Sequence, residues 1–208
     1  INFASSMVGH WHGGLGLAGV IACALFAAVS GSSPACVVAI GSILLPAMVK
    51  QGFPRDFGAG VITTSGALGI LIPPSIAMVM YSVATNTSVG QLFMAGVVPG
   101  LMLATLLGLT TWYRARKFGY PRLPKASFRQ RLHAFRESMW GLFLIVVVIG
   151  GIYTGIFTPT EAAAMSAVYA FIVAVFVYKD LTLKQVPKVL LDSASMSAML
   201  LYIITNAV

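Results

Sequence analysis

Long apolar runs alternate with short polar segments along the 208 residues of the chain. Stretches that carry no charge, or a single carboxylate, cover residues 13–29, 34–49, 57–86, 87–113, 138–157 and 159–178. A helix of about 20 apolar residues is long enough to cross the hydrocarbon core of a bilayer. The pattern therefore predicts an all-α polytopic membrane protein.

Turn-forming residues interrupt the apolar pattern at two places. The first is Ser30-Gly31-Ser32-Ser33-Pro34, and the second is Gly69-Ile70-Leu71-Ile72-Pro73-Pro74-Ser75. Lipid cannot satisfy the backbone groups that such turns expose, so they are tolerated only inside protein or beside water or an ion. Paired interruptions of this kind indicate the midplane binding site of a secondary transporter.

The first interruption predicts a re-entrant helical hairpin over residues 13–49. As a helix, residues 34–49 would span ~24 Å, which is less than the roughly 30 Å of the hydrocarbon core. Two complete crossings remain the alternative, because both arrangements return the chain to the same face. In the second interruption, Pro73 and Pro74 remove two backbone donors and predict a broken transmembrane helix over 57–86. The fold expected is ion-transporter-like.

Composition and charge place most of the chain in lipid. The sequence is 58% hydrophobic and 9% charged, whereas soluble domains carry about 25% charged residues. The net charge is +8, and eight of the thirteen Lys and Arg lie in residues 114–136. All thirteen fall on one face if the runs over 57–86, 87–113, 138–157 and 159–178 each cross once, which predicts cytoplasmic basic loops. We expect residues 114–136 to form a cytoplasmic loop with an interfacial helix that contacts lipid, and not to bind nucleic acid.

The two ends of the chain carry weaker signals. Residues 1–12 predict an interfacial segment, with His10 and His12 as a possible metal pair that lacks a neighbouring carboxylate or Cys. Residues 187–208 predict the start of a further, truncated helix, so we expect a fragment of a longer protein.

Thr158-Pro159-Thr160-Glu161 has the spacing of a capping box, with Thr158 at the N-cap, Pro159 at N1 and Glu161 at N3. A proton-carrier role is the alternative for Glu161, because it is the carboxylate at the start of an apolar span.

The interruptions are rich in neutral oxygens. Away from their ends the spans contain no Asp, Glu, Lys or Arg, which disfavours a proton relay. They offer hydroxyls instead: Ser30, Ser32, Ser33, Thr63, Thr64, Ser65 and Ser75. Neutral oxygens suit Na⁺, and half-helices beginning at Pro34 and near Pro74 would direct positive N-termini at an anion. The alternative is that these small residues only permit tight helix packing.

Several motifs together resemble a known family. They are Ser30-Gly31-Ser32-Ser33, Ala39-Ile40-Gly41, Pro46, the stretch from Leu68 to Ser75, Tyr81, Leu92-Phe93-Met94-Ala95-Gly96, Pro99-Gly100 and Thr160-Glu161-Ala162-Ala163-Ala164. The set resembles the large membrane subunit of tripartite ATP-independent periplasmic (TRAP) transporters, the DctM or SiaM type of permease, over nearly the whole chain. The resemblance implies a permease of the bacterial inner membrane.

It further implies Na⁺-coupled uptake of a small organic anion, of the C4-dicarboxylate or sialic acid type, by an elevator mechanism. The implied partners are a small membrane subunit and a periplasmic substrate-binding protein, with Na⁺ as the coupling ion and no cofactor. The residues implied to bind Na⁺ are Ser30, Gly31, Ser32, Ser33, Thr64, Gly69, Ile72 and Pro73. Those implied to face the substrate are Ser32, Ser33, Pro34, Pro74 and Ser75.

The sequence departs from the family pattern in two respects. Pro34 and Cys36 stand where the family pattern has other residues, and the family's second, inverted hairpin and second broken helix are not in this sequence.

Two other classes of protein are the alternatives. An enzyme would need a catalytic dyad, carboxylate pair or metal cluster within the spans, and we predict that the chain is not one. A structural or channel-like subunit without coupled transport is the alternative function, although no charged rings typical of a pore appear.

Overall fold

The computed structural model describes residues 1–207, and this part of the chain contains helices and no strand. It divides into two compact units, residues 1–163 and the residues from 164 onward. The first unit holds α1 (Asn2–Val8), α2 (Gly14–Ser30), α3 (Ser33–Lys50), α4 (Arg55–Gly66), α5 (Leu68–Leu71), α6 (Ile76–Thr85), α7 (Val89–Lys117), α8 (Phe128–Tyr153) and the start of α9 (Pro159–Ile172). The second holds the rest of α9, a π-helical turn (Val173–Val177) and α10 (Val186–Ala207).

Six helical segments among the described residues are long and apolar enough to cross a membrane. They are Ser33–Lys50, Arg55–Thr85, Val89–Lys117, Phe128–Tyr153, Pro159–Val177 and Val186–Ile203. The prediction of an all-α polytopic membrane protein is confirmed. Residue 208 of the expected terminal helix lies outside the described residues.

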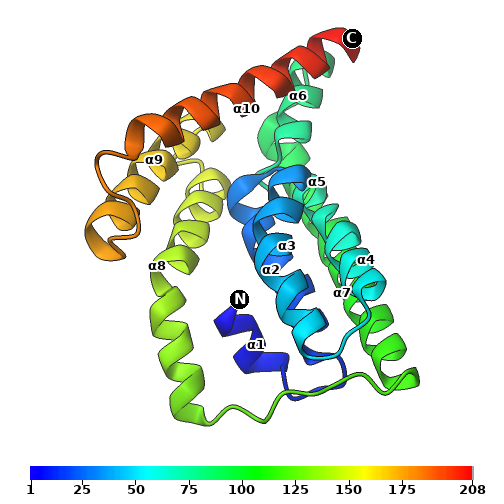
Figure 1. The fold of residues 1–208 in the computed structure, drawn as a ribbon. Coiled ribbons are helices and arrows are strands. Elements are labelled where there is room, and N and C mark those ends of the chain that lie inside the picture. Colours follow the sequence, from blue (N-terminus) through cyan, green and yellow to red (C-terminus); the bar gives the residue numbers. More distant parts are fainter. Residues whose placement is uncertain (208) are drawn as a thin grey trace. The chain divides into compact units, whose positions relative to one another are not determined.

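The helices α2 and α3 form a tight helical hairpin and lie side by side in Figure 1. The turn between them begins at Gly31, whose φ of +59° belongs to the left-handed region that glycine adopts without strain. Ser32 then caps α3 by accepting a hydrogen bond from Ala35 N at 3.5 Å. The arms approach so closely that a Cβ on Gly19 would lie 2.4 Å from Leu44. With 17 and 18 residues, α2 and α3 are about 26 and 27 Å long, so the re-entrant arrangement stays a prediction.

The next apolar run contains a helix that is interrupted at the two prolines. After α4 and the single turn of α5, Ile72 and Ser75 adopt extended backbone, and helical structure resumes in α6. The Pro73–Pro74 peptide bond is cis. Because neither proline has a backbone N–H, no regular helix can continue through this point.

The basic segment is divided differently from the sequence-based expectation. Residues 114–117 form the last turn of α7, and residues 118–127 connect it to α8, which runs without interruption from Phe128 to Tyr153. A separate interfacial helix ending before residue 138 is therefore absent from this part of the structure. Ser127 and Gln130 form a capping box that starts α8 early, and the residues that follow favour a helix across the expected boundary.

A second capping box begins α9, as the sequence predicts. The Thr158 backbone N–H and hydroxyl both donate to Glu161 Oε2 at 2.8 Å, and Glu161 N donates to Thr158 Oγ1 at 3.3 Å. Both directions of the reciprocal pair are thus present.

This geometry predicts that Glu161→Gln keeps its function in the complete permease. The amide oxygen of Gln can still accept from Thr158, so we expect normal substrate uptake and a small drop in thermal stability. Uptake and thermal unfolding of the purified permease measure both quantities. Complete loss of uptake in a Gln variant that folds and expresses normally would instead support an ionic role for Glu161.

Candidate functional site

The hairpin tip and the helix break meet, backbone against backbone. Ile76 N donates a hydrogen bond to Gly31 O at 3.2 Å. A Cβ on Gly31 would lie 2.5 Å from Pro74 O and 3.3 Å from Ser75 Cα. Figure 1 shows α5 beside the end of the α2–α3 hairpin. The two interruptions of the sequence therefore form one junction, which we call the tip–break junction and define as residues 30–34 and 69–76.

Gly69 provides the second close approach in the tip–break junction. A Cβ at this position would lie 2.8 Å from Ser32 C, 2.9 Å from Ser32 O and 2.9 Å from Ser33 N. Real Cβ atoms are not found this close to backbone atoms, so the contact requires glycine. Gly31 and Gly69 thus allow carbonyl groups from both segments to lie within one small region.

The tip serines lie at the end of α2, where Ser30 is the last residue, and at the start of α3, where Ser32 is the N-cap and Ser33 the first residue. Ser30 Oγ accepts a long hydrogen bond from Ser32 N at 3.4 Å and lies 3.5 Å from Cys36 Sγ. Ser32 Oγ accepts from Ala35 N, and Ser33 is half-buried. A hydroxyl oxygen has two lone pairs, so Ser30 and Ser32 keep acceptor capacity for a further partner.

Two buried hydroxyls in the broken helix have no hydrogen-bond partner among the described residues. Ser75 is 1% exposed and Ser65 is 0% exposed, and the Oγ of each is unpaired. An unpaired buried polar group costs about 1–3 kcal/mol, so native proteins normally supply it with a partner. Ser75 belongs to the tip–break junction, and a bound cation would satisfy its oxygen.

Ser65 is a candidate that the predicted site did not include. It stands four residues before Gly69 and four after Val61, on the helix face that packs into the core with Leu68, Ala27 and Cys36. Its spacing from Gly69 is the sequence signal that identifies it, because positions i and i+4 share one face of a helix.

The structure places Thr64 in a different setting. Its hydroxyl donates to Gly60 O at 2.8 Å and to Val61 O at 3.2 Å, within its own helix. Its side chain lines a cavity of about 260 Å³ whose opposite wall is formed by α7, at Leu107 and Thr110. Thr64 is therefore not brought together with the tip serines.

The remaining residues of the predicted site belong to the tip–break junction and differ in how deeply they are buried. Pro73 is buried, Ile72 and Pro74 are half-buried, and Pro34 is exposed in the first turn of α3. Ile72 contacts α7, where a Cβ on Gly100 would lie 3.1 Å from its side chain. The structure thus gathers Ser30, Gly31, Ser32, Ser33, Gly69, Pro74 and Ser75.

His10 and His12 do not form a metal pair in this structure. The Arg122 guanidinium donates to His12 Nε2, so that nitrogen is not free to bind a metal. In the part of the chain that the structure describes, no group of three His, Cys, Asp or Glu side chains is placed to hold a metal ion.

A hairpin tip packed against a broken helix, among apolar helices long enough to span a membrane, defines a multi-pass membrane protein with the interrupted helices that are typical of transporter folds. Comparison with known proteins gives the particular family. Residues 1–208 match the model of the tripartite ATP-independent periplasmic transporter, DctM component, and the chain belongs to this family.

Relatives in several bacteria support the assignment. The chain is 78% identical over 222 residues to the C4-dicarboxylate TRAP transporter large permease protein DctM of Rhodobacter capsulatus, covering all of this chain and 50% of that protein. It is 55% identical over 207 residues to the DctM of Pseudomonas aeruginosa, again over the whole chain and 48% of that protein. The sialic acid TRAP transporter permease protein SiaT of Haemophilus influenzae is 42% identical over 88% of this chain and 30% of its own length. The chain thus spans about half the length of its DctM relatives.

Proposed function

We propose that this chain forms one half of the substrate pathway of a Na⁺-coupled permease for small organic anions, with one Na⁺ bound in the tip–break junction. The observation that carries the proposal is the backbone contact between Gly31 and the segment from Pro74 to Ile76. That contact gathers neutral oxygen atoms from two interrupted helices in one place. Unwound carbonyls of broken transporter helices are the groups that coordinate Na⁺ in such folds.

The proposed ligands are the neutral oxygens of the junction. The hydroxyl of Ser75 is buried without a partner, and those of Ser30 and Ser32 keep free lone pairs. Ser33, half-buried in the first turn of α3, supplies a further hydroxyl from the tip. Carbonyl groups of Gly69, Ile72 and Pro73 complete the set. Ser65, four residues before Gly69 in the chain, has a further buried hydroxyl without a partner.

The proposed substrate is a C4-dicarboxylate. Two relatives of 78% and 55% identity carry that substrate in their names, whereas the sialic acid permease is 42% identical. Helices α3 and α6 both begin at the junction, at Ser33 and Ile76. The positive N-terminal ends of two helices suit a carboxylate, and Ser32, Ser33, Pro34, Pro74 and Ser75 would border it.

The proposed assembly has three components in the bacterial inner membrane. A small membrane subunit and a periplasmic binding protein would accompany the complete permease, as the family description implies. The hairpin would move together with the broken helix as an elevator. In support, Ile62 of α4 packs in one buried cluster with Ile40 and Leu44 of α3 and Cys23 of α2.

Uptake into proteoliposomes that contain the complete permease and both partners tests the proposal. We expect saturable uptake of radiolabelled succinate that requires an inward Na⁺ gradient and accelerates in counterflow. Unsaturable flux that is independent of Na⁺ would favour a channel-like subunit. Saturable uptake of sialic acid, without uptake of succinate, would contradict the proposed substrate and leave the proposed Na⁺-coupled permease intact.

The one-sided distribution of Lys and Arg predicts the orientation. Residue 126 lies in the connection between α7 and α8 and should be cytoplasmic, whereas Thr87, between α6 and α7, should be periplasmic. We expect an impermeant thiol reagent added to intact cells to label Thr87→Cys and not Ala126→Cys, each in a background without native cysteines. The opposite labelling would invert the orientation.

A further inference from the structure

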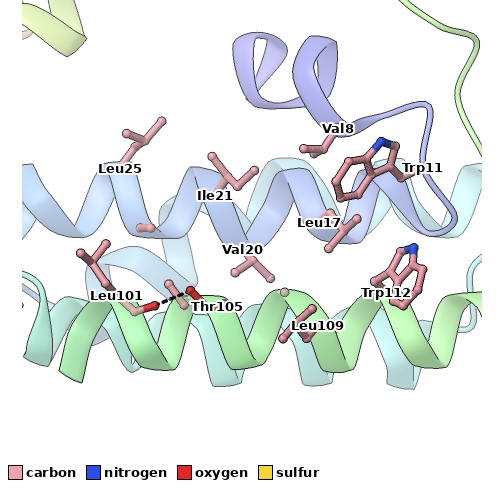
Figure 2. A pocket seen from close by; sticks show the side chains of 13 residues that line it. Val8, Trp11, Leu17, Val20, Ile21, Leu25, Leu101, Thr105, Leu109 and Trp112 are labelled. Atoms are coloured by element: carbon pink, nitrogen blue, oxygen red, sulfur yellow. Dashed lines mark hydrogen bonds between the residues drawn. The ribbon is translucent and has the colours of Figure 1, made fainter. Parts of the chain in front are cut away.

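An apolar crevice with a volume of about 560 Å³ lies between α2 and α7. Figure 2 shows Leu25 and Leu101 at one end and the indole rings of Trp11 and Trp112 at the other. Aliphatic side chains of both helices form the walls between these ends. The hydroxyl of Thr105, which also lines the crevice, donates to Leu101 O at 2.7 Å, so its O–H is already paired within α7.

The length and the mean cross-section of the crevice indicate what kind of group it can enclose. Leu101 and Trp112 are eleven residues apart on α7, which corresponds to about 16 Å along the helix axis. Dividing the volume by this length gives a mean cross-section of about 35 Å². A helix with side chains is about 10–12 Å wide and needs roughly 80–110 Å². The crevice can therefore enclose a hydrocarbon chain, whereas a whole helix would not fit inside it and could only pack along its open side.

The tryptophan end of the crevice carries positive charge. The Arg116 guanidinium lies over the Trp112 ring, 5.6 Å from its centroid. The Arg122 guanidinium donates to His12 Nε2, next to Trp11 in the chain. A backbone hydrogen bond from Leu123 N to Gly9 O, at 2.9 Å, holds the Arg122 segment against this end of the molecule.

Both arginines act on His12: the Arg122 guanidinium donates to its Nε2, and the charge of Arg116 also affects the imidazole. Desolvation, followed by the charges of Arg122 and then Arg116, lowers the pKa of His12 below its ordinary value, so the imidazole remains neutral at pH 7. In the part of the chain that the structure describes, no carboxylate forms an ion pair with Arg116 or Arg122. The tryptophan end of the crevice therefore presents two positive charges that no carboxylate among the described residues neutralises.

We propose that the crevice binds one acyl chain of an anionic phospholipid, whose phosphate lies between Arg116 and Arg122. Trp11 and Trp112 stand at the boundary between chain and headgroup, which is the level that tryptophan prefers in a bilayer. Guanidinium groups bind phosphate through paired N–H donors. The lipid belongs to the leaflet on the basic side, where phosphatidylglycerol supplies the negative charge.

A large side chain introduced at position 108 would compete with the acyl chain for the space in the crevice. It lines the crevice, and a Cβ at this position would meet no atom within 4 Å. Gly108→Phe should fill the space without disturbing the fold. Gly150→Phe is the matched control, because Gly150 is also a helical glycine with open space around it and does not line the crevice.

Native mass spectrometry of the complete permease, released from nanodiscs of phosphatidylglycerol and phosphatidylcholine, measures the bound lipid. We expect one retained phosphatidylglycerol in the unmodified protein and in Gly150→Phe, and its loss in Gly108→Phe. Arg116→Gln with Arg122→Gln lies outside the apolar core and should lower the preference for phosphatidylglycerol by about tenfold or more.

Two results would overturn the proposal. One is retention of the same lipid by Gly108→Phe together with an unchanged lipid preference in the arginine variant. The other is efficient photocrosslinking from a benzophenone probe at position 108 to a peptide from the other half of the permease, with no crosslink to lipid. If Gly108→Phe fails to fold, the arginine variant and the photocrosslink decide between lipid and protein as the occupant.

Discussion

Replacing Gly69 with alanine should abolish Na⁺-dependent uptake by the complete permease. The added Cβ would lie within 2.9 Å of three backbone atoms of Ser32 and Ser33, so the hairpin tip must move away from the helix break. The oxygens proposed to bind Na⁺ would then no longer lie around one point. We expect uptake at saturating substrate to fall by a factor of about 100 or more, because displacement of about 1 Å is enough to disrupt a preorganised site.

Gly60→Ala is the matched control for this change. Gly60 lies on the same broken helix, and a Cβ there would meet no atom within 4 Å. It should retain uptake and gain slightly in stability, because alanine favours a helix more than glycine does. Normal Na⁺-dependent uptake in Gly69→Ala would show that the close contact at Ser32 is not needed for transport.

Removing the hydroxyl of Ser75 or Ser33 should weaken Na⁺ binding without weakening the fold. The Ser75 oxygen is buried without a partner, so its replacement by alanine removes a desolvated polar group from the apo protein. The loss of one ion ligand is expected to cost about 1–3 kcal/mol of binding energy by analogy with an unsatisfied buried polar group. This corresponds to roughly a five- to hundredfold rise in the Na⁺ concentration needed for half-maximal uptake.

Thermal unfolding with and without Na⁺ separates binding from folding. Ser75→Ala should unfold at the same temperature as the unmodified protein, or higher, in the absence of Na⁺, and should lose most of the stabilisation that Na⁺ provides. Ser42→Ala serves as a control, because the Ser42 hydroxyl donates to Ala39 O within α3, away from the junction. An unchanged Na⁺ dependence of uptake in both Ser75→Ala and Ser33→Ala would mean that the junction is only a packing contact.

Much of this architecture can be predicted from the sequence, because the bilayer restricts both the length and the polarity of the segments that cross it. Apolar length identifies the spans, and the prolines at 73 and 74 identify the break, because a helix cannot pass through them. Glu161 and Thr158 identify a helix start through a local hydrogen-bond pattern. These features depend on residues that are near one another in the chain.

The contact between the tip and the break is harder to predict from the sequence, because it joins segments about 40 residues apart through backbone atoms. Gly31 and Gly69 are needed because backbone atoms of the other segment lie very close to them. The sequence shows only that these two positions have no side chain, and not which backbone atoms lie nearby. The side on which a hydroxyl lies also depends on helix packing. Thr64 therefore lies toward α7, whereas the adjacent Ser65 is fully buried.

A double-mutant cycle between Ser33 in the tip and Ser75 in the break tests most directly whether both segments bind one ion. The affinity of the purified complete permease for Na⁺ is measured by titration calorimetry for the unmodified protein, both single alanine variants and the double variant. Binding to one shared ion predicts that each single change weakens Na⁺ binding and that their effects differ from additivity by more than about 0.5 kcal/mol. Unchanged affinity in the single variants, or losses that add within about 0.3 kcal/mol, would contradict a shared Na⁺ site.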